Sequence, residues 1–326
     1  MFAITVTEPG PPDVLHWTEV PTPEPGPGEV LVRTVAAGVN RADLLQRQGH
    51  YPPPPGITDV MGLEASGVVE RVGDGVTGWH PGDEVVALLA GGGYAEYFVA
   101  PAGQLLRAPA GIDLVTASAL IEVAATVHSN MRHVHLSAGE TLLVHGGAGG
   151  IGQFAIQYAR SLGCRLAATA GTPEKLDTCR SLGAEIALDY HGDWLQGLLE
   201  ATGGRGADVI LDVMGAKYLE SNVAALAPDG RLCIIGMQGG AKGTLNLGIL
   251  LAKRGTVTAT SLRARPLPQK AEICAAVAAS VWPLYEQGLV SAPPVTRIPM
   301  PDAARAHELL GSGVSSGKIA LVAPQH

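Results

Sequence analysis

The stretch that most constrains the fold is TLLVHGGAGGIGQFAIQYAR, where an apolar run, a glycine-rich turn and an amphipathic segment follow one another. Its glycines have the spacing G-x-G-x-x-G. Between a strand and a helix, this spacing is typical of a dinucleotide site, because the bare backbone approaches the pyrophosphate and the positive end of the helix attracts the phosphates. The alternative is an ordinary glycine-rich turn. The cofactor contacts expected from this turn are Gly147, Gly149, Gly150, Ile151 and Gly152.

The end of the next apolar run indicates which cofactor is used. NAD-preferring sites usually carry an acid there, about 20 residues after the glycine turn. This chain has Gly171 and Thr172 instead, and Glu174 falls in the first turn of the next expected helix, for which Thr172 is a suitable N-cap. The missing acid favours NADPH. Gly171 and Thr172 are expected to bond its 2′-phosphate, and Lys175 either adds charge or is a solvated surface residue.

The order of apolar patterns predicts two domains in this chain of 326 residues. Short β-rich runs separated by Pro and Gly come first, and a helical segment at 113–134 leads into alternating strands and helices. The C-terminal part is mixed again and ends in a strand. We expect an α/β protein in which a Rossmann-type doubly wound parallel sheet, residues 123–265, is inserted into a β-rich domain, residues 1–122 and 266–326.

Composition excludes several classes of protein. Thirty acidic residues against twenty-two basic ones give a net charge of −8 without a Lys/Arg block, so nucleic acid is not expected as the main partner. No apolar run reaches the roughly 18 residues of a membrane-spanning helix, and the N-terminus lacks a signal-peptide pattern, so we expect a cytoplasmic protein without membrane contact. The cysteines are widely spaced and are expected to be reduced thiols: Cys164, Cys179, Cys233 and Cys274.

Four segments of the chain carry a likeness to a known family: AAGVNRADLLQRQGHYPPPPG (36–56), GLEASGVV (62–69), GGAGGIGxxxxQ (146–157) and SGKIALV (316–322). They resemble the zeta-crystallin-like quinone oxidoreductases of the medium-chain dehydrogenase/reductase superfamily, and the likeness covers nearly the whole chain. The nearest likeness is to the sub-branch that contains the damage-inducible human quinone reductase. The resemblance implies a GroES-like catalytic domain interrupted by a Rossmann domain, NADPH as hydride donor, a quinone or conjugated carbonyl as acceptor, and a homodimer.

The same comparison predicts that no metal is bound. Related zinc-dependent alcohol dehydrogenases bind the metal through a Cys after an A-x-G turn and a His in G-H-E. Here Val39 and Asn40 follow the turn, and Leu63 replaces the histidine. His133 and His135 form H-x-H, but with no Cys or acid close by we interpret them as surface histidines.

The resemblance also implies roles for individual residues. Asn40 is expected beside the nicotinamide, Tyr51 in the substrate pocket and Tyr190 at the adenosine 2′-phosphate. Each has a structural alternative. Asn40 could bond nearby backbone at a turn, Tyr51 could pack on prolines 52–55, and Tyr190 could be an aromatic residue at the end of a strand. Asn40 and Tyr51 are the expected catalytic donors for negative charge on the acceptor oxygen. Further positions matched to the nicotinamide or its phosphates are Thr126, Gly236, Met237, Gln238 and Lys318.

One segment departs from the family, and two other functions stay open. Where relatives carry P-E-A-W-L-T, residues 121–126 read IEVAAT, and smaller side chains there would widen the pocket. Reduction of a C=C bond by an enoyl or alkenal reductase would use the same hydride geometry. A non-catalytic NADPH-binding protein, structural or RNA-binding, is the alternative of another class.

Overall fold

The structure, a computed structural model, describes residues 1–314 and 317–324. Ser316 of the SGKIALV marker therefore lies outside the described residues. The chain divides into two compact units. The first comprises 1–125, 262–287 and 292–326, and the second comprises 126–261 and 288–291. The domain boundaries expected after residues 122 and 265 stay a prediction.

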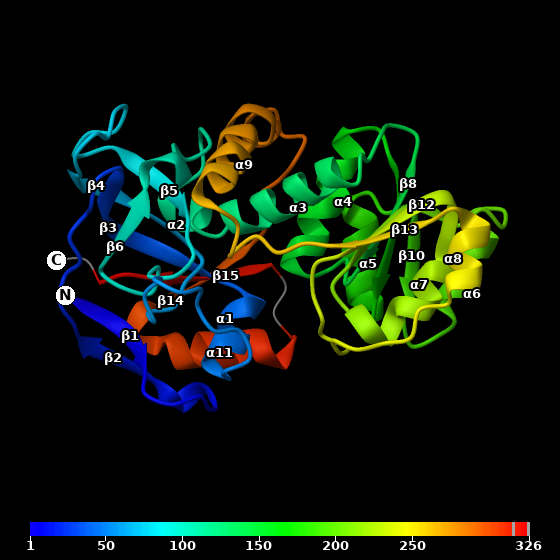
Figure 1. Ribbon diagram of the computed structural model, residues 1–326, viewed down its shortest axis with the longest axis horizontal. Helices are drawn as coiled ribbons and strands as arrows, with labels where there is room; N and C mark the ends of the chain where they lie inside the picture. Colours follow the sequence, from blue (N-terminus) through cyan, green and yellow to red (C-terminus); the bar gives the residue numbers. More distant parts are fainter. Residues whose placement is uncertain (315–316, 325–326) are drawn as a thin grey trace. The chain divides into compact units, whose positions relative to one another are not determined.

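A six-stranded parallel sheet forms the centre of the second unit, in the order β10-β9-β8-β11-β12-β13. Read along the chain, this is the 3-2-1-4-5-6 order of dinucleotide-binding folds. Its strands are parallel because helices return the chain after most of them (Figure 1). The strands are β8 (Thr141–His145), β9 (Arg165–Ala170), β10 (Ile186–Asp189), β11 (Ala207–Asp212), β12 (Leu226–Ile234) and β13 (Thr256–Ala259).

Two groups of helices accompany this sheet, which explains why strands such as TLLVH are buried along their whole length. In one group α4 packs against α5, and in the other α7 packs against α6 and α8. The predicted doubly wound sheet is confirmed. The helices are α4 (Gly150–Ser161), α5 (Pro173–Leu182), α6 (Trp194–Ala201), α7 (Leu219–Ala225) and α8 (Leu247–Lys253).

Local sequence determines where these helices begin and end, and α5 illustrates this. The Thr172 hydroxyl accepts a hydrogen bond from the Lys175 backbone N–H, and Pro173 occupies the first helical position, where no N–H is needed. Gly183 ends the helix in the left-handed conformation, with φ +115°. The predicted N-cap role of Thr172 is confirmed.

A seven-stranded sheet in the order β14-β15-β3-β4-β5-β7 forms the core of the first unit, and β6 also pairs with β3. β1 and β2 make a separate hairpin-like pair. The C-terminal β15 pairs with the N-terminal β3, so the two ends of the sequence share one sheet. The strands are β1 (Phe2–Val6), β2 (Leu15–Glu19), β3 (Glu29–Val39), β4 (Glu64–Val72), β5 (Glu84–Leu88), β6 (Tyr97–Pro101), β7 (Leu105–Leu106), β14 (Val295–Pro299) and β15 (Lys318–Val322).

The helical segment expected at 113–134 is two helices rather than one. Asp113 caps the first through the backbone N–H groups of Val115 and Thr116, and that helix ends after one turn. The remaining helices of the chain are α1 (Arg41–Arg47), α2 (Leu114–Ala117), α3 (Ile121–His133), α9 (Leu267–Ser280), α10 (Trp282–Glu286) and α11 (Ala303–Ser312). Short 3₁₀ turns lie at Pro12–Val14, Ala102–Gln104, Gly215–Tyr218 and Met300–Asp302.

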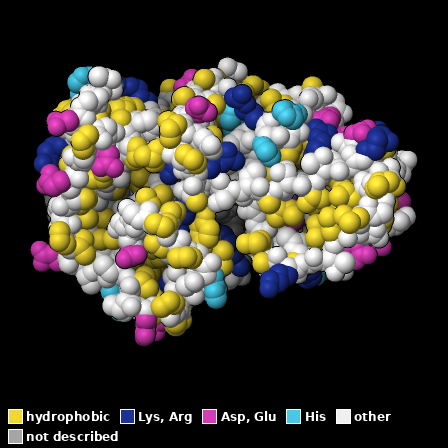
Figure 2. All heavy atoms as spheres, viewed as in Figure 1, with side chains coloured by type: hydrophobic (Ala, Val, Ile, Leu, Met, Phe, Trp, Pro, Cys, Tyr) yellow, Lys and Arg dark blue, Asp and Glu magenta, His cyan; other side chains and the backbone are white. Residues whose placement is uncertain are grey.

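Other predictions from composition can be checked against the structure. All four cysteines are buried thiols, and burial raises the pKa of Cys164 and Cys179 to about 11. His133 and His135 are exposed, as expected. Across the described part of the chain, no helix is both long and apolar enough to cross a membrane. Figure 2 shows Lys and Arg side chains interspersed with Asp and Glu on the visible face.

Candidate active site

The glycine-rich turn joins β8 to α4 at the carboxyl end of the parallel sheet, where this fold binds ligands. Gly149 is the N-cap of α4, and Gly150 and Ile151 begin the helix. Because the first backbone N–H groups of a helix have no partner within it, this turn presents donors and the positive helix end together. That arrangement suits the phosphates of a dinucleotide.

Two of these glycines are required by close packing. A Cβ at Gly152 would lie 2.4 Å from the carbonyl oxygen of Gly146, so no side chain fits where α4 approaches the turn. A Cβ at Gly147 would lie 2.7 Å from both the Ala168 side chain and the Cys179 sulfur. Gly147 thus lets the turn lie directly on β9 and α5. These contacts match the roles of glycine in a dinucleotide-binding turn and disfavour an ordinary loop.

The carboxyl end of β9 carries no acid that points to a ribose. Gly171 follows the strand, and the Thr172 hydroxyl caps α5. Glu174 is held in the helix start, because its own backbone N–H and the Thr172 hydroxyl bond its carboxylate and lower its pKa. Its structural role is confirmed. Lys175 is half-buried in the same first turn.

Tyr190 lies against the end of β9. Its backbone N–H donates to the Ala170 carbonyl at 3.1 Å, which ties the end of β10 to the end of β9. Its phenol lies over Gly171, because a Cβ there would be 2.2 Å from the Tyr190 hydroxyl oxygen. Tyr190 is 42% exposed, and its ring packs at a tilt of 52° against His191, with 4.7 Å between ring centroids. A phenol hydroxyl therefore occupies the space where a side chain on residue 171 would begin.

The loops after β11 and β12 complete this edge of the sheet. The Gln238 backbone N–H donates to the Val213 carbonyl at 3.1 Å, so the segment holding Gly236, Met237 and Gln238 contacts the end of β11. The Met237 side chain is 64% exposed. Asp212, which sequence reasoning missed, holds the β11 loop, because its buried carboxylate accepts from the Met214 and Gly215 backbone N–H groups at 2.7 and 2.9 Å.

A second group of predicted residues lies in the first unit, around Asn40. This residue precedes α1, and its backbone N–H donates to the Asp43 carboxylate at 2.8 Å. This bond is one half of a capping box at the start of α1. The Asn40 Nδ2 donates to Glu64 Oε1 at 2.9 Å, and Lys318 Nζ donates to Asn40 Oδ1 at 2.6 Å. Glu64 was missed from sequence, and Lys318 contacts Asn40 directly.

Behind Asn40, a buried polar network supports α1. The Tyr94 hydroxyl donates to Asp43 at 3.0 Å and lies 3.4 Å from His307 Nε2. Arg47 lies 3.4 Å from His307 Nδ1. Burial raises the pKa of Asp43 to about 6 and lowers the pKa of His307 to about 3. This network stabilises the turn from which Asn40 projects.

Tyr51 is half-buried and rests on Arg263, whose guanidinium carbon lies 5.0 Å from the ring centroid. The guanidinium donates to the Tyr51 carbonyl at 3.1 Å, to the Gln46 side chain at 2.7 Å and to the Ala90 carbonyl at 2.7 Å. Four contacts thus fix a cation that is itself only 6% exposed. Arg263, also missed from sequence, holds the Tyr51 segment in place.

Comparison with known proteins agrees with both units. A model of the alcohol dehydrogenase GroES-like domain matches residues 26–110, and a model of the zinc-binding dehydrogenase family matches residues 150–277. The quinone oxidoreductase of Pseudomonas aeruginosa is 35% identical over 317 residues, which are 96% of this chain and 97% of that protein. The chain belongs to the quinone oxidoreductase family of the medium-chain dehydrogenases/reductases.

The solved structures support the same assignment. The present chain is similar to the crystal structure of Escherichia coli quinone oxidoreductase complexed with NADPH, with a TM-score of 0.90 and 32% identity. The match covers 99% of this chain and 100% of that chain. The predicted Rossmann-type sheet with a GroES-like β domain is confirmed, and so is the prediction of an oxidoreductase. The non-catalytic alternative is therefore not supported.

A relative named for another reaction is also similar over nearly the whole chain. The 2-haloacrylate reductase of a Burkholderia species is 31% identical over 335 residues, which are 99% of this chain and 99% of that protein. Family membership therefore establishes a reductase of the quinone oxidoreductase type. The two relatives are named for different acceptors, a quinone and a 2-haloacrylate.

Although one matched model is named for zinc binding, the residues here do not suit that metal. Val39 and Leu63 are buried apolar side chains at the positions of the expected ligands. Among the residues that the structure describes, no group of three or more His, Cys, Asp or Glu side chains is arranged to hold a metal ion.

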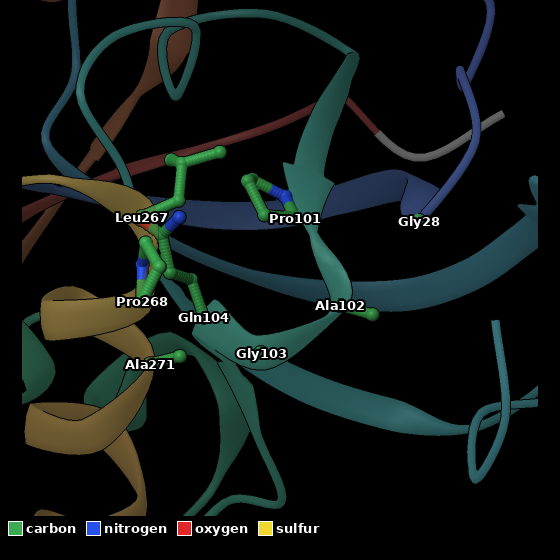
Figure 3. A pocket seen from close by; sticks show the side chains of 8 residues that line it. All are labelled: Gly28, Pro101, Ala102, Gly103, Gln104, Leu267, Pro268 and Ala271. Atoms are coloured by element: carbon green, nitrogen blue, oxygen red, sulfur yellow. The ribbon is translucent and has the colours of Figure 1, made fainter. Parts of the chain in front are cut away.

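A surface pocket of the first unit is separate from these residues (Figure 3). It has a volume of about 210 Å³ and is lined mainly by small and apolar side chains of the β6–β7 turn and α9, including Pro101, Leu267 and Pro268. None of the predicted site residues lines it. Its lining lacks an ionisable group. Thr126, in α3, is 9% exposed, and its carbonyl accepts from Asn130 at 2.7 Å.

Proposed function

We propose that this enzyme is an NADPH-dependent, zinc-independent quinone oxidoreductase that passes a hydride to a quinone or another conjugated carbonyl. The observation that carries the proposal is the end of β9, where the Tyr190 phenol lies over Gly171 and no acid is free to bind a ribose 2′-hydroxyl. Such a site accepts a phosphate at this position, since a carboxylate would repel it.

Several residues are proposed to bind the cofactor. The amides of Gly150, Ile151 and Gly152 would receive the pyrophosphate. The remaining groups lie along the same sheet edge or in its flanking segments. At the 2′-phosphate these are Gly171, Thr172, Lys175 and Tyr190, and nearer the nicotinamide they are Thr126, Gly236, Met237 and Gln238. NADPH supplies the hydride, and the protein's task is to orient the acceptor and stabilise the charge that develops on it.

In this proposal Asn40 and Tyr51 are the catalytic donors. A quinone or enone that accepts a hydride develops negative charge on an oxygen, and N–H or O–H donors held in place stabilise that charge. Asn40 is held by Glu64 and Lys318, and Tyr51 by Arg263, so neither donor has to be ordered during the reaction. No metal is required, because these donors take the place of a Lewis acid.

The experiment that tests the proposal is steady-state oxidation of NADPH with ortho- and para-quinones, run beside 2-haloacrylates and α,β-unsaturated ketones. We expect the highest kcat/KM with a quinone. The second candidate is reduction of a C=C bond, favoured by the 2-haloacrylate reductase relative and by the small side chains at 121–126. It would be preferred if a haloacrylate or enone gave the highest kcat/KM, and metal analysis finding stoichiometric zinc would contradict the metal-free proposal.

Three further expectations belong to this proposal: likeness to the sub-branch of the damage-inducible human enzyme, a cytoplasmic location and a homodimer. The dimer is tested by sedimentation equilibrium of the purified protein, which should give twice the mass of one 33.5 kDa chain. A single-chain mass at micromolar concentration would contradict it.

A further inference from the structure

The carboxamide of Asn40 is held by two side chains of opposite charge. Glu64 Oε1 accepts from Asn40 Nδ2 at 2.9 Å, Lys318 Nζ donates to Asn40 Oδ1 at 2.6 Å, and Lys318 also donates to Glu64 Oε1 at 2.9 Å. The three side chains form a closed triangle. All three residues are buried, with 8%, 0% and 6% of Asn40, Glu64 and Lys318 exposed.

The chemistry of the two neighbours determines which way the carboxamide points. The oxygen and nitrogen of an asparagine side chain are nearly isosteric, so their assignment normally depends on the surrounding hydrogen bonds. A carboxylate only accepts and an ammonium only donates. Asn40 must therefore turn Nδ2 to Glu64 and Oδ1 to Lys318. Of the two Nδ2 hydrogens, one is taken by Glu64, and no described residue accepts the other.

The framework around the triangle keeps it from relaxing. The second oxygen of Glu64 accepts from the Glu122 backbone N–H at 2.9 Å. Gly38 makes room for this carboxylate, because a Cβ there would lie 2.3 Å from Glu64 Oε1. Lys318 begins β15, and its backbone N–H donates to the Pro294 carbonyl at 2.9 Å. Glu64 in β4 and Lys318 in β15 are thus both held by the seven-stranded sheet.

We propose that Glu64 and Lys318 are positioning residues that hold Asn40 as a hydrogen-bond donor, with its remaining Nδ2 hydrogen reserved for an oxygen of the bound acceptor. The inference rests on the proposed function, in which Asn40 contacts the substrate. It gives Lys318 a role within the protein, different from the cofactor contact that the family resemblance implies. It also restricts the substrate to molecules that present an acceptor oxygen at this point.

The first test is Glu64→Gln. Because a glutamine amide both donates and accepts, only the Lys318 ammonium then still favours one orientation of the Asn40 carboxamide. We expect kcat to fall about tenfold or more, less than the hundred- to thousandfold typical for removal of an oxyanion donor, with the Kd for NADPH changed less than about twofold. The matched control is Glu140→Gln, which breaks the 2.8 Å ion pair with Arg231 in the other unit and should leave kcat unchanged.

A double-mutant cycle separates positioning from general damage. If Glu64 acts through Asn40, Asn40→Ala/Glu64→Gln should be no slower than Asn40→Ala alone. Rate losses that multiply would overturn the proposal. Because a lone buried lysine is destabilising, the neutral pair Glu64→Gln/Lys318→Met provides a second variant that keeps no unpaired charge. It should fold and show the same loss of kcat, and full activity in this variant would also overturn the proposal.

A spectroscopic readout keeps this inference distinct from the proposed function. In protein labelled with ¹⁵N-asparagine, the Asn40 side-chain amide is assigned by its loss in Asn40→Asp. We expect two well-separated Nδ2 proton resonances that exchange slowly with water and that merge toward solvent-exposed values in Glu64→Gln. If these resonances are present without quinone turnover, the proposed function fails and the positioning role stands. If the wild-type resonances resemble those of a free amide, the positioning role fails.

Discussion

Replacement of His307 by phenylalanine should change how stability depends on pH. In the folded protein the His307 ring is buried between Tyr94 and Arg47, and burial, with a smaller repulsion from Arg47, lowers its pKa from 6.5 to about 3. The folded state therefore binds this proton less readily than the unfolded chain. The contribution of neutral His307 is fully present above pH 6.5, and it is lost as the pH falls from 6.5 toward 3.

The size of this effect follows from the two pKa values. Integrating the proton difference from pH 7 to pH 4 gives a loss of about 3 kcal/mol in the free energy of unfolding. Asp43 acts in the opposite direction. Its pKa is raised to about 6, so its protonation between pH 7 and pH 4 increases the free energy of unfolding by about 2 kcal/mol. The free energy of unfolding of the wild type should therefore change little between pH 7 and pH 4, because the contributions of His307 and Asp43 have opposite signs and similar size.

The assay is urea unfolding followed by tryptophan fluorescence at several pH values, since three of the four tryptophans lie in the same unit as His307. Relative to wild type, His307→Phe should gain about 3 kcal/mol of stability between pH 7 and pH 4. The exposed His16, replaced in the same way, provides the control for the loss of a surface histidine. A flat difference for His307→Phe would refute the reasoning that burial keeps this ring neutral.

Three further predictions concern the site. Gly152→Ala should weaken NADPH binding by at least about tenfold, because its Cβ would meet a backbone oxygen at 2.4 Å, and fluorescence titration against wild type measures this. Gly171→Ala should weaken binding by displacing the Tyr190 phenol, while adding Tyr190→Ala should cause little further loss; fully additive losses would contradict the contact. Arg263→Ala should raise the KM for quinones with the NADPH Kd unchanged, because the contacts that are lost, to Tyr51, Gln46 and Ala90, all lie in the first unit.

The elements of the fold that could be predicted from sequence are those formed by residues close together in the chain. The strand TLLVH, its glycine turn and the following helix are continuous in the chain, and they became β8, the turn and α4. The cap of α5 is likewise local, since Thr172 and Lys175 are three residues apart. The four-residue strands β10 and β13 carry too short a pattern to be recognised, so they emerged only from the structure.

Contacts between distant residues could not be predicted in this way. Glu64 and Lys318 are 254 positions apart and meet because β15 and β4 pair with opposite edges of β3. Arg263 is 212 positions from the Tyr51 carbonyl that it bonds. The available signal was weak but present: Lys318 begins an otherwise apolar strand, Glu64 begins a strand whose next five residues are uncharged, and a buried charge in such a place requires a partner.

The central claim, that this enzyme uses NADPH through the site at the ends of β9 and β10, is tested most directly by titrating NADPH and NADH into wild type, Lys175→Ala and Tyr190→Phe. Cofactor fluorescence reports the binding. We predict tighter binding of NADPH than of NADH, a clear loss of NADPH affinity in both variants, and little change for NADH in either. Equal affinity for the two cofactors in wild type, or NADPH binding unaffected by both substitutions, would contradict the account.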